Sequence, residues 1–433
     1  MNRFHAVFLC LLFPLTGFCK NARVDSLELL RKKALSGEKE SAFFLADAYF
    51  YGKDVKKNPV LAVYWYRIAA QKGLAEAQYN LACCLESGTG CRPDPAGAYS
   101  WYAKASGQQF APAMLRMFHY YRTGLKGADG KILAEVSLQK GMALLRVLSA
   151  KGHKEAQILL SSALLRKGST EKEQKEAFLL LQRLAGSSGA DGVVLRMLSD
   201  CYYGGLGCEK NPEKAVFFLR KAAALKDPEA MAKLGFFLEY GLCGLTADRQ
   251  EAFACYRRSA FGGHPLGQCK YAEFLYQRAA GSKKAVLEAL EWYRKSALQG
   301  CVQALHFLGR TFRDGIPGIW ESDLKKAAGS FFAAARNGYA PSQYELALMF
   351  QNKQINGRED KEAAFYWFLQ GAMQGHLPSL HQAAECYLEG RGVERSYVNG
   401  TRLLRAAAEK GDYKAGRRLQ ELLISERYSG TGF

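Results

Sequence analysis

The sequence predicts an all-α fold, a solenoid of about ten helical hairpins, and three observations carry this prediction. A small residue followed four positions later by an apolar one, and eight positions later by an aromatic residue or leucine, recurs along the chain. Within each copy the apolar residues recur at three and four positions, which is the period of an amphipathic helix. Prolines stand where these helices would begin or in loops, and glycines stand where the first helix of a hairpin would end.

One anchor residue marks each copy of the repeating unit. Successive anchors lie 36 to 43 residues apart, and the widest interval holds an insertion between Lys126 and Lys140. We therefore expect ten hairpins over residues 38–412, a capping half-repeat helix over 25–37, and a C-terminal capping helix with a tail over 413–433. The anchors are Ser41, Ala77, Ala113, Ala156, Val194, Ala230, Gly267, Ala304, Ser342, Ser379 and Ala415.

Proline placement supports these helix boundaries. Pro59 follows Asn58 and Pro95 follows Asp94, which is a capping side chain followed by a residue without an N–H group. At the first turn of a helix that missing N–H group costs nothing, whereas inside a helix a proline costs about 3 kcal/mol. These pairs predict the starts of second helices, and Gly88 is expected to end a first helix.

The N-terminus has the features of a secretory leader. Arg3 provides a positive charge, and the apolar stretch from Ala6 to Phe13 follows it. That stretch is too short to span a bilayer, which takes about 20 apolar residues. We expect residues 1–19 to be a signal peptide and the protein to be secreted or periplasmic. The cleavage site and lipidation at Cys19 are left open.

The chain is strongly basic, with a formal net charge of +19. Such an excess favours anionic partners, so binding of an anionic polymer is one expectation. The charges are spread through the helical pattern, and the clusters are pairs such as Lys56-Lys57. A merely solvated basic surface is therefore the alternative.

Several copies carry a recognisable motif around the predicted turn. The unit anchored at Ala77 continues with Leu81, Leu85 and Gly88, and the Gly390–Val393 loop has the sequence Gly-Arg-Gly-Val. Together these positions resemble the Sel-1-like repeat family, a relative of the tetratricopeptide repeats, over nearly the whole mature chain. The resemblance implies a right-handed α/α superhelix that binds a protein or peptide, and it implies no reaction.

The sequence offers no motif for catalysis. It contains no His-Glu-x-x-His, Gly-x-Ser-x-Gly or Walker-type loop, and no Cys-x-x-Cys pair of zinc spacing. We therefore expect a non-enzymatic scaffold with no catalytic residue, cofactor or metal. A hydrolase is the less favoured alternative, because cysteine-rich members of the family have been linked to β-lactam binding.

Four cysteines show a regular spacing. Cys84 and Cys91 lie seven and fourteen residues after one anchor, and Cys201 and Cys208 lie at the same distances after another. A disulfide within each pair would attach the loop to the first helix, which export would allow. The alternative is that each pair consists of small apolar thiols in a core.

Arrays of this kind usually bind partners in the groove lined by the first helices. By analogy with tetratricopeptides, groove positions lie two, six and nine residues after each anchor. Aromatic and arginine side chains there suit an extended, partly acidic peptide, with Arg310 and Arg313 as the best pair, although any one aromatic residue could instead be packing. The candidates are Tyr79, His119, Arg122, Arg196, Tyr203, Tyr276, His306, Arg310, Arg313, Tyr344 and His381.

Overall fold

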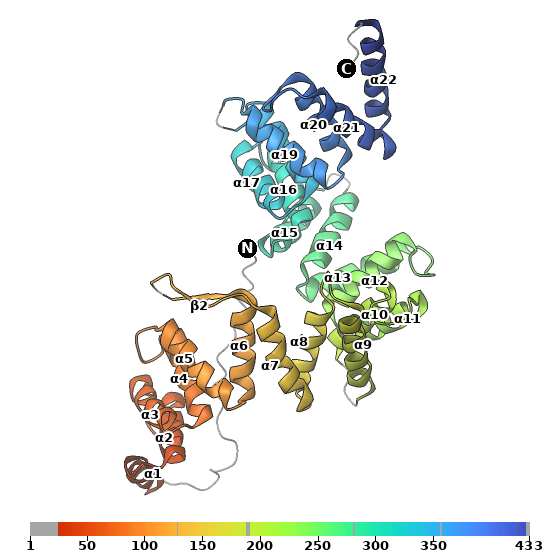
Figure 1. Cartoon of the computed structure of the whole chain (residues 1–433). Coiled ribbons are helices and arrows are strands. Elements are labelled where there is room, and N and C mark those ends of the chain that lie inside the picture. Colours follow the sequence, from red (N-terminus) through yellow and green to blue (C-terminus); the bar gives the residue numbers. More distant parts are fainter. Residues whose placement is uncertain (1–24, 128, 188–190, 280–281, 356, 430–433) are drawn as a thin grey trace. The chain divides into compact units, whose positions relative to one another are not determined.

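The computed structural model describes residues 25–127, 129–187, 191–279, 282–355 and 357–429, and most of them are helical (Figure 1). The predicted leader, residues 1–19, lies outside this range. Among the residues described, no helix is both long and apolar enough to cross a membrane. The chain divides into two compact units, one ending at Asn211 and one beginning at Pro212.

The first unit contains ten helices and a short two-stranded sheet within its described residues. Each helix packs against its neighbours in the chain order. The elements are α1 (Asp25–Leu35), α2 (Lys39–Tyr51), α3 (Pro59–Gln71), α4 (Ala75–Ser87), α5 (Pro95–Gly107), α6 (Ala111–Thr123), β1 (Leu125–Lys126), β2 (Ile132–Ala134), α7 (Leu138–Ala150), α8 (Lys154–Leu164), α9 (Glu171–Gly186) and α10 (Gly192–Gly204).

The second unit is wholly helical in its described residues apart from its loops and one isolated β-bridge. Here too each helix packs on the one before and the one after. The helices are α11 (Pro212–Ala224), α12 (Pro228–Tyr240), α13 (Arg249–Phe261), α14 (Pro265–Arg278), α15 (Lys283–Leu298), α16 (Val302–Asp314), α17 (Leu324–Arg336), α18 (Ala340–Gln351), α19 (Lys361–Met373), α20 (Leu377–Glu389), α21 (Tyr397–Glu409) and α22 (Tyr413–Ser429). The predicted all-α solenoid of helical hairpins is confirmed.

The helix ends follow the predicted capping chemistry. The Asn58 side chain accepts a hydrogen bond from the N–H group of Leu61 at 3.1 Å, directly before Pro59 at the start of α3. Asp94 accepts from Gly97 at 2.9 Å at the start of α5. Each cap satisfies one backbone donor that the first turn leaves without a helical partner.

The second glycine of the Gly-x-Gly loop is required by a close backbone approach. Gly392 has φ +72°, and a Cβ atom built there would lie 2.0 Å from the carbonyl oxygen of Lys361, the first residue of α19. Gly90 approaches the carbonyl oxygen of Pro59 in the same way, at 2.2 Å. The loop of one hairpin therefore lies against the second helix of the preceding hairpin, and any side chain would separate them.

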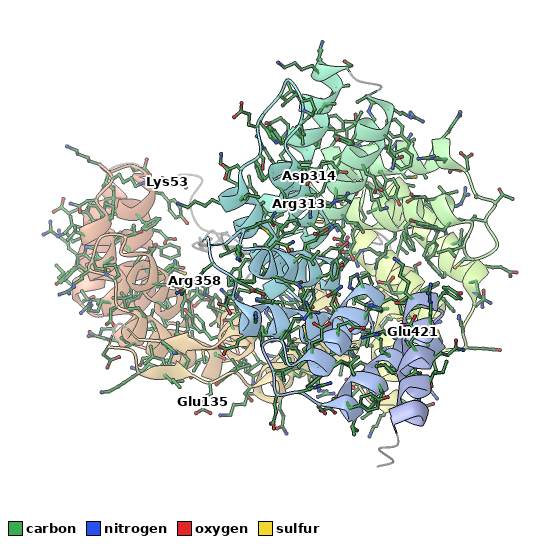
Figure 2. All side chains as sticks on the ribbon, turned by 90° about the horizontal axis from the view of Figure 1, so that it is seen from above. Lys53, Glu135, Arg313, Asp314, Arg358 and Glu421 are labelled. Atoms are coloured by element: carbon green, nitrogen blue, oxygen red, sulfur yellow. The ribbon has the colours of Figure 1, made fainter. Side chains whose placement is uncertain are left out.

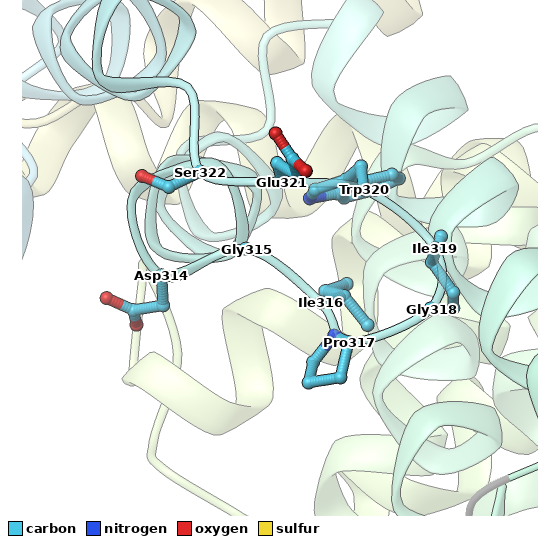
Figure 3. A pocket seen from close by; sticks show the side chains of 9 residues that line it. All are labelled: Asp314, Gly315, Ile316, Pro317, Gly318, Ile319, Trp320, Glu321 and Ser322. Atoms are coloured by element: carbon cyan, nitrogen blue, oxygen red, sulfur yellow. The ribbon is translucent and has the colours of Figure 1, made fainter.

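Two hairpins carry enlarged turns. Leu125–Lys126 and Ile132–Ala134 pair antiparallel, so the insertion expected after Lys126 forms a small β-hairpin. In the other turn Ile316 bridges Trp320 (Figure 3). The Trp320 indole donates to the carbonyl oxygen of Thr311 at 3.1 Å. Both turns begin at a glycine with positive φ and extended ψ, 159° at Gly124 and 173° at Gly315, so the chain leaves the helix in a different direction from other first-helix glycines.

The core of each unit runs along the hairpins. Three second-helix tyrosines, Tyr66, Tyr102 and Tyr256, are fully buried in it, and each donates to an acidic side chain on the preceding first helix. Tyr256, for example, donates to Glu239 at 2.7 Å. Such a hydrogen bond removes the cost of burying a phenol and fixes the two helices of a hairpin against each other.

Candidate partner-binding site

The predicted groove positions do not all face the same surroundings. Tyr79, two residues after its anchor, is only 8% exposed and packs against the tilted ring of Tyr102 and edge-on against Phe110. Tyr344 is half-buried and packs against the rings of Phe368 and His376. At Tyr79 and Tyr344 this position therefore belongs to the packing within a hairpin and against the next one, which leaves little surface for a partner.

Arg313 lies at the third groove position but is held by acidic neighbours. Its Nε is 2.7 Å from Oδ1 of Asp314, the adjacent residue labelled in Figure 2. Its Nη1 forms an ion pair with Glu345 on the next first helix. The hydrogen bond to Asp314, together with the charges of Glu345 and Asp314, raises the pKa of Arg313 against the effect of burial. Arg313 and Arg310 therefore do not act as a pair, because Arg313 is held in ion pairs, one of which joins two hairpins.

The same ion pair recurs between other neighbouring hairpins. Glu86 pairs with Arg116, and Glu239 pairs with Lys270 at 3.6 Å. In each case the residue nine after one anchor contacts the residue three after the next anchor. In the pair of Arg313 with Glu345 the base comes nine residues after the anchor and the acid three after the next anchor. The same two positions are therefore in contact, with the charges reversed.

Buried glutamines form a second recurring link, one residue after the anchor. Gln268 donates to the carbonyl oxygen of Ala260 at 3.5 Å and accepts from Gln299 at 2.8 Å. Gln343 repeats the arrangement, donating to Ala335 at 3.1 Å and accepting from Gln374 at 2.8 Å. The amide satisfies a carbonyl at the end of the previous second helix.

One pocket brings several predicted residues together. It has a volume of 430 Å³ and lies within the second unit, between α14, α15, α16 and the residue that precedes α18. Tyr276, His306 and Arg310 of the predicted set line it, although they come from two different hairpins. The full lining is Leu266, Cys269, Lys270, Glu273, Tyr276, Gln277, Tyr293, Gln303, His306, Phe307, Arg310 and Tyr339.

Stacked aromatic rings form one wall of this pocket. Tyr293 and Phe307 lie parallel, with ring centroids 3.9 Å apart, and Tyr276 meets Phe307 edge-on at 4.9 Å. Tyr293 is buried, so it anchors the wall in the core. Rings fixed in this way offer apolar contact area without a large loss of side-chain entropy on binding.

The two cations of the pocket differ in their surroundings. Lys270 Nζ lies 3.0 Å from Glu273 and 3.6 Å from Glu239. Burial acts to lower the pKa of Lys270, but the hydrogen bond and charge of Glu273, with Glu239, raise it overall. Arg310 is exposed and forms no ion pair with any described residue. Arg310 is therefore the cation available to a ligand.

His306 is the neutral polar group of the pocket. Its Nδ1 lies 2.9 Å from the Ser342 hydroxyl, and its ring packs against Phe331 and Tyr339. Burial, followed by the charges of Arg310 and Arg313, lowers the pKa of His306 to about 4. At neutral pH it is an uncharged donor or acceptor, and Arg310 carries the positive charge beside it.

Two cysteines that the sequence left without partners meet beside the pocket. Cys269 is 5% exposed on α14, and Cys301 is the N-cap residue of α16. The Cys269 thiol donates a hydrogen bond to the Cys301 sulfur, which lowers the pKa of Cys301 to about 6 with help from the N–H groups of Gln303 and Ala304. Their separation of 32 residues follows no motif, so the sequence could not pair them.

The regularly spaced cysteines lie where the sequence placed them, as thiols. The Cys91 sulfur donates to the carbonyl oxygen of Cys84 at 3.5 Å, so the loop folds back onto the end of α4. Cys201 is buried and interacts electrostatically with Cys208 at the equivalent turn of α10. The structure holds all ten described cysteines in the thiol form, and a disulfide within either pair stays a prediction.

The remaining predicted residues are dispersed. Arg122 is exposed beside His119, with Nη2 3.4 Å from the histidine Nδ1. Arg196 pairs with Asp200 at 3.9 Å, and Tyr203 is 43% exposed near the end of α10. His381 is partly buried on α20. In the part of the chain that is described, no group of three or more histidine, cysteine or acidic side chains could hold a metal ion.

Fold and site together define a helical-repeat protein with an open, arginine-bearing pocket on its first helices. The Sel1 repeat family model matches residues 39–74, 75–109, 154–186, 194–227, 228–264, 265–301, 340–376 and 377–412. This chain belongs to the Sel1 repeat family. The unmatched stretches 110–153 and 302–339 still form helix pairs, but they contain the two enlarged turns.

Relatives of known name are larger proteins. The chain is 28% identical over 298 residues to chitin synthase regulatory factor 3 of Schizosaccharomyces pombe, covering 65% of this chain and 31% of that protein. It is 26% identical over 291 residues to the chitin synthase regulator SKT5 of Saccharomyces cerevisiae, covering 65% and 41%. The chain therefore spans well under half the length of these two relatives.

Among solved structures, the chain resembles a protective antigen of uropathogenic Escherichia coli that displays an SLR fold. The TM-score is 0.52 and the sequence identity is 26%, and the match covers 93% of this chain and 82% of the antigen. This likeness supports the solenoid architecture.

Proposed function

We propose that this protein is a non-enzymatic scaffold that holds a protein or peptide partner in the pocket between α14 and α16. The observation that carries the proposal is the pocket around Arg310, where an available guanidinium stands beside stacked aromatic rings. An extended chain could place an acidic group on Arg310 and an apolar side chain against Phe307. Arginine binds carboxylates through two parallel hydrogen bonds, which gives direction as well as affinity.

The electrostatics of the pocket favour an acidic group at one point. Lys270 is already paired with Glu239 and Glu273, so an incoming carboxylate would meet repulsion there. Beside Arg310 the neutral His306 adds a hydrogen-bonding group and no negative charge that would repel a carboxylate. The pocket therefore selects for a single carboxylate near Arg310, as an aspartate, a glutamate or a chain terminus would provide.

The names of the relatives agree with action on another protein. Two of them are named as regulators of chitin synthase, an activity exercised through a partner. Because this chain spans only 31% and 41% of those proteins, their targets are not carried over. Their names support the scaffold class and nothing narrower.

The proposal includes export, which rests on the leader predicted over residues 1–19. A charged residue followed by a short apolar stretch is typical of a secretory signal. Expression of the full chain in its own cells, followed by N-terminal sequencing of the mature protein, tests export. A protein that begins at Met1 and stays in the cytosol would contradict it.

An anionic polymer is the second candidate partner, and the net charge of +19 favours it. Binding through a spread-out basic surface would weaken steeply with salt and would depend little on any single arginine. Binding through the pocket would depend on Arg310 and would respond to salt far less.

Site-directed photo-crosslinking tests the pocket mode. A benzophenone amino acid at Gln303, an exposed residue of the pocket wall, should capture a protease-sensitive partner in the cells of origin. The same probe at Lys325, exposed on α17, is the control and should not capture that partner. Adding Arg310→Glu should abolish the capture at Gln303. Equal capture from both positions would contradict a pocket-bound partner.

A further inference from the structure

The thiol pair formed by Cys269 and Cys301 has a place in the fold that packing alone does not explain. Cys269 belongs to the first helix of one hairpin and lines the pocket, while Cys301 caps the first helix of the next hairpin. The two side chains pack in one cluster with Tyr293 and Leu308. A bond between their sulfur atoms would therefore join two neighbouring repeats at the edge of the pocket.

The two thiols are arranged as an attacking and a resolving cysteine. Cys301 is only partly buried, and its thiol donates to the Gln303 side chain at 3.3 Å on the pocket side. Cys269 lies behind it, nearly fully buried in the same cluster, and its thiol interacts with Cys301. A reagent entering from solvent thus meets Cys301 first and finds Cys269 in position to displace it.

Local charge supports ionisation of the outer thiol. The N-terminus of a helix stabilises a nearby thiolate through the partial positive charge of its first backbone N–H groups. The groups that face the pair from the packed elements are Lys270 and Glu273 on α14, Tyr293 on α15, and Tyr339 before α18. Lys270 and Glu273 are paired with each other, so their opposite charges largely cancel at Cys301. Ionisation of the Cys301 thiol is therefore favoured mainly by the helix terminus and by Cys269.

We propose that Cys269 and Cys301 are a redox-active thiol pair that closes to a disulfide by exchange with a small-molecule disulfide such as glutathione disulfide. The Cys301 thiolate attacks one sulfur of the reagent, the reagent's S–S bond breaks, and one glutathione leaves as its thiol after taking up a proton. Cys269 then gives up its proton and attacks the Cys301 sulfur, which releases the second glutathione. Two protein thiols are oxidised and one disulfide is reduced to two thiols.

The bridge would act on the pocket as well as on stability. It would add a covalent link between the two hairpins, whereas the 2.8 Å hydrogen bond between Gln268 and Gln299 joins α14 to the end of α15 within one hairpin. It would also remove the Cys269 thiol from the pocket wall. A bridge across neighbouring repeats restricts the unfolded chain, so the oxidised protein should unfold at a higher temperature than the reduced one.

Peptide mapping of the full chain tests the proposal directly. After equilibration with glutathione disulfide, blocking with iodoacetamide and digestion with trypsin, Cys269 falls in the peptide 259–270 and Cys301 in the peptide 296–310, each with a single cysteine. The expected product is a non-reduced species joining these two peptides, which disappears on adding reduced glutathione. Before oxidation, iodoacetamide should label the partly exposed Cys301 faster than the buried Cys386 at pH 7, because Cys301 is more accessible and has the larger thiolate fraction.

Two variants separate the proposal from general oxidation. Cys301→Ser should abolish the joined peptide and leave Cys269 unmodified, whereas Cys386→Ser, a buried thiol of another hairpin, should leave the joined peptide unchanged. Absence of the joined peptide in the wild-type chain would overturn the proposal, whether Cys301 stays a thiol or retains a glutathione adduct. These readings concern the thiols alone and do not depend on the proposed partner.

Discussion

The pocket histidine gives the sharpest test of the electrostatics around Arg310. An unfolded chain protonates this histidine near pH 6.5, whereas in the folded protein the pKa of His306 is lowered to about 4. Between pH 4 and pH 6.5 this histidine is protonated in the unfolded chain and neutral in the folded protein. The stabilising effect is therefore complete above pH 6.5 and is lost as the pH falls towards 4. The difference corresponds to about 3 kcal/mol, which solvent around a partly exposed ring reduces to about 2 kcal/mol.

Two measurements check this prediction. An NMR titration of the folded chain with labelled histidine, assigned by the signal lost in His306→Gln, should show His306 titrating near pH 4. Denaturant unfolding should show that the wild type loses about 2 kcal/mol more than His306→Gln between pH 7.5 and 4.5, since all other titrating groups are common to both. A midpoint at or above 6.5 for His306 would refute the account of its burial and of the neighbouring guanidinium charges.

Three further predictions follow from the contacts between repeats. Gly392→Ala should lower the free energy of unfolding by about 2 kcal/mol or more in denaturant titrations, because positive φ and the Lys361 carbonyl both oppose a Cβ atom. Arg313→Glu should cost about 1 kcal/mol, and the double exchange with Glu345→Arg should recover most of it in a double-mutant cycle. Non-reducing peptide maps of the protein purified from its own cells should show whether Cys84 and Cys91 are joined, and thiols at both positions would end that hypothesis.

The glycine prediction has a matched control. Gly411 also has positive φ, at +90°, but nothing lies within 4 Å of a Cβ atom built there. Gly411→Ala should therefore cost only the conformational term, about 1 kcal/mol. If both substitutions cost the same, the close approach of the loop to α19 is not what requires glycine at Gly392.

The sequence predicted the architecture well because the repeat averages over many copies. Helix periodicity, the Asn58 and Asp94 caps and the Gly88 stop each express a local rule, and the structure confirms each of them. The insertion after Lys126 was located as an irregular interval, but its β-hairpin was not predicted. Strand pairing depends on contacts between short segments, which a helical period does not report.

The site was less predictable because it depends on contacts between repeats. The prediction took the residues two, six and nine after each anchor as groove residues in every hairpin alike. It therefore put the buried Tyr79 and the ion-paired Arg313 in the same predicted set as the available Arg310. A comparison of acidic and basic residues between neighbouring units would have found Arg313 with Glu345. No sequence signal would have found Cys269 with Cys301, because their meeting follows from how one hairpin stacks on the next.

The central claim is that Arg310 receives an acidic group of a protein partner. The direct measurement is the affinity of the crosslinked and purified partner for three intact chains: the wild type, Arg310→Glu, and Arg402→Glu, an exposed arginine of α21 that makes the same change of charge. Reversing the charge at Arg310 should weaken binding at least about tenfold, while Arg402→Glu should stay within about twofold of the wild type. Equal losses in both variants would show that the basic surface as a whole attracts the partner, and an unchanged affinity for Arg310→Glu would contradict the pocket.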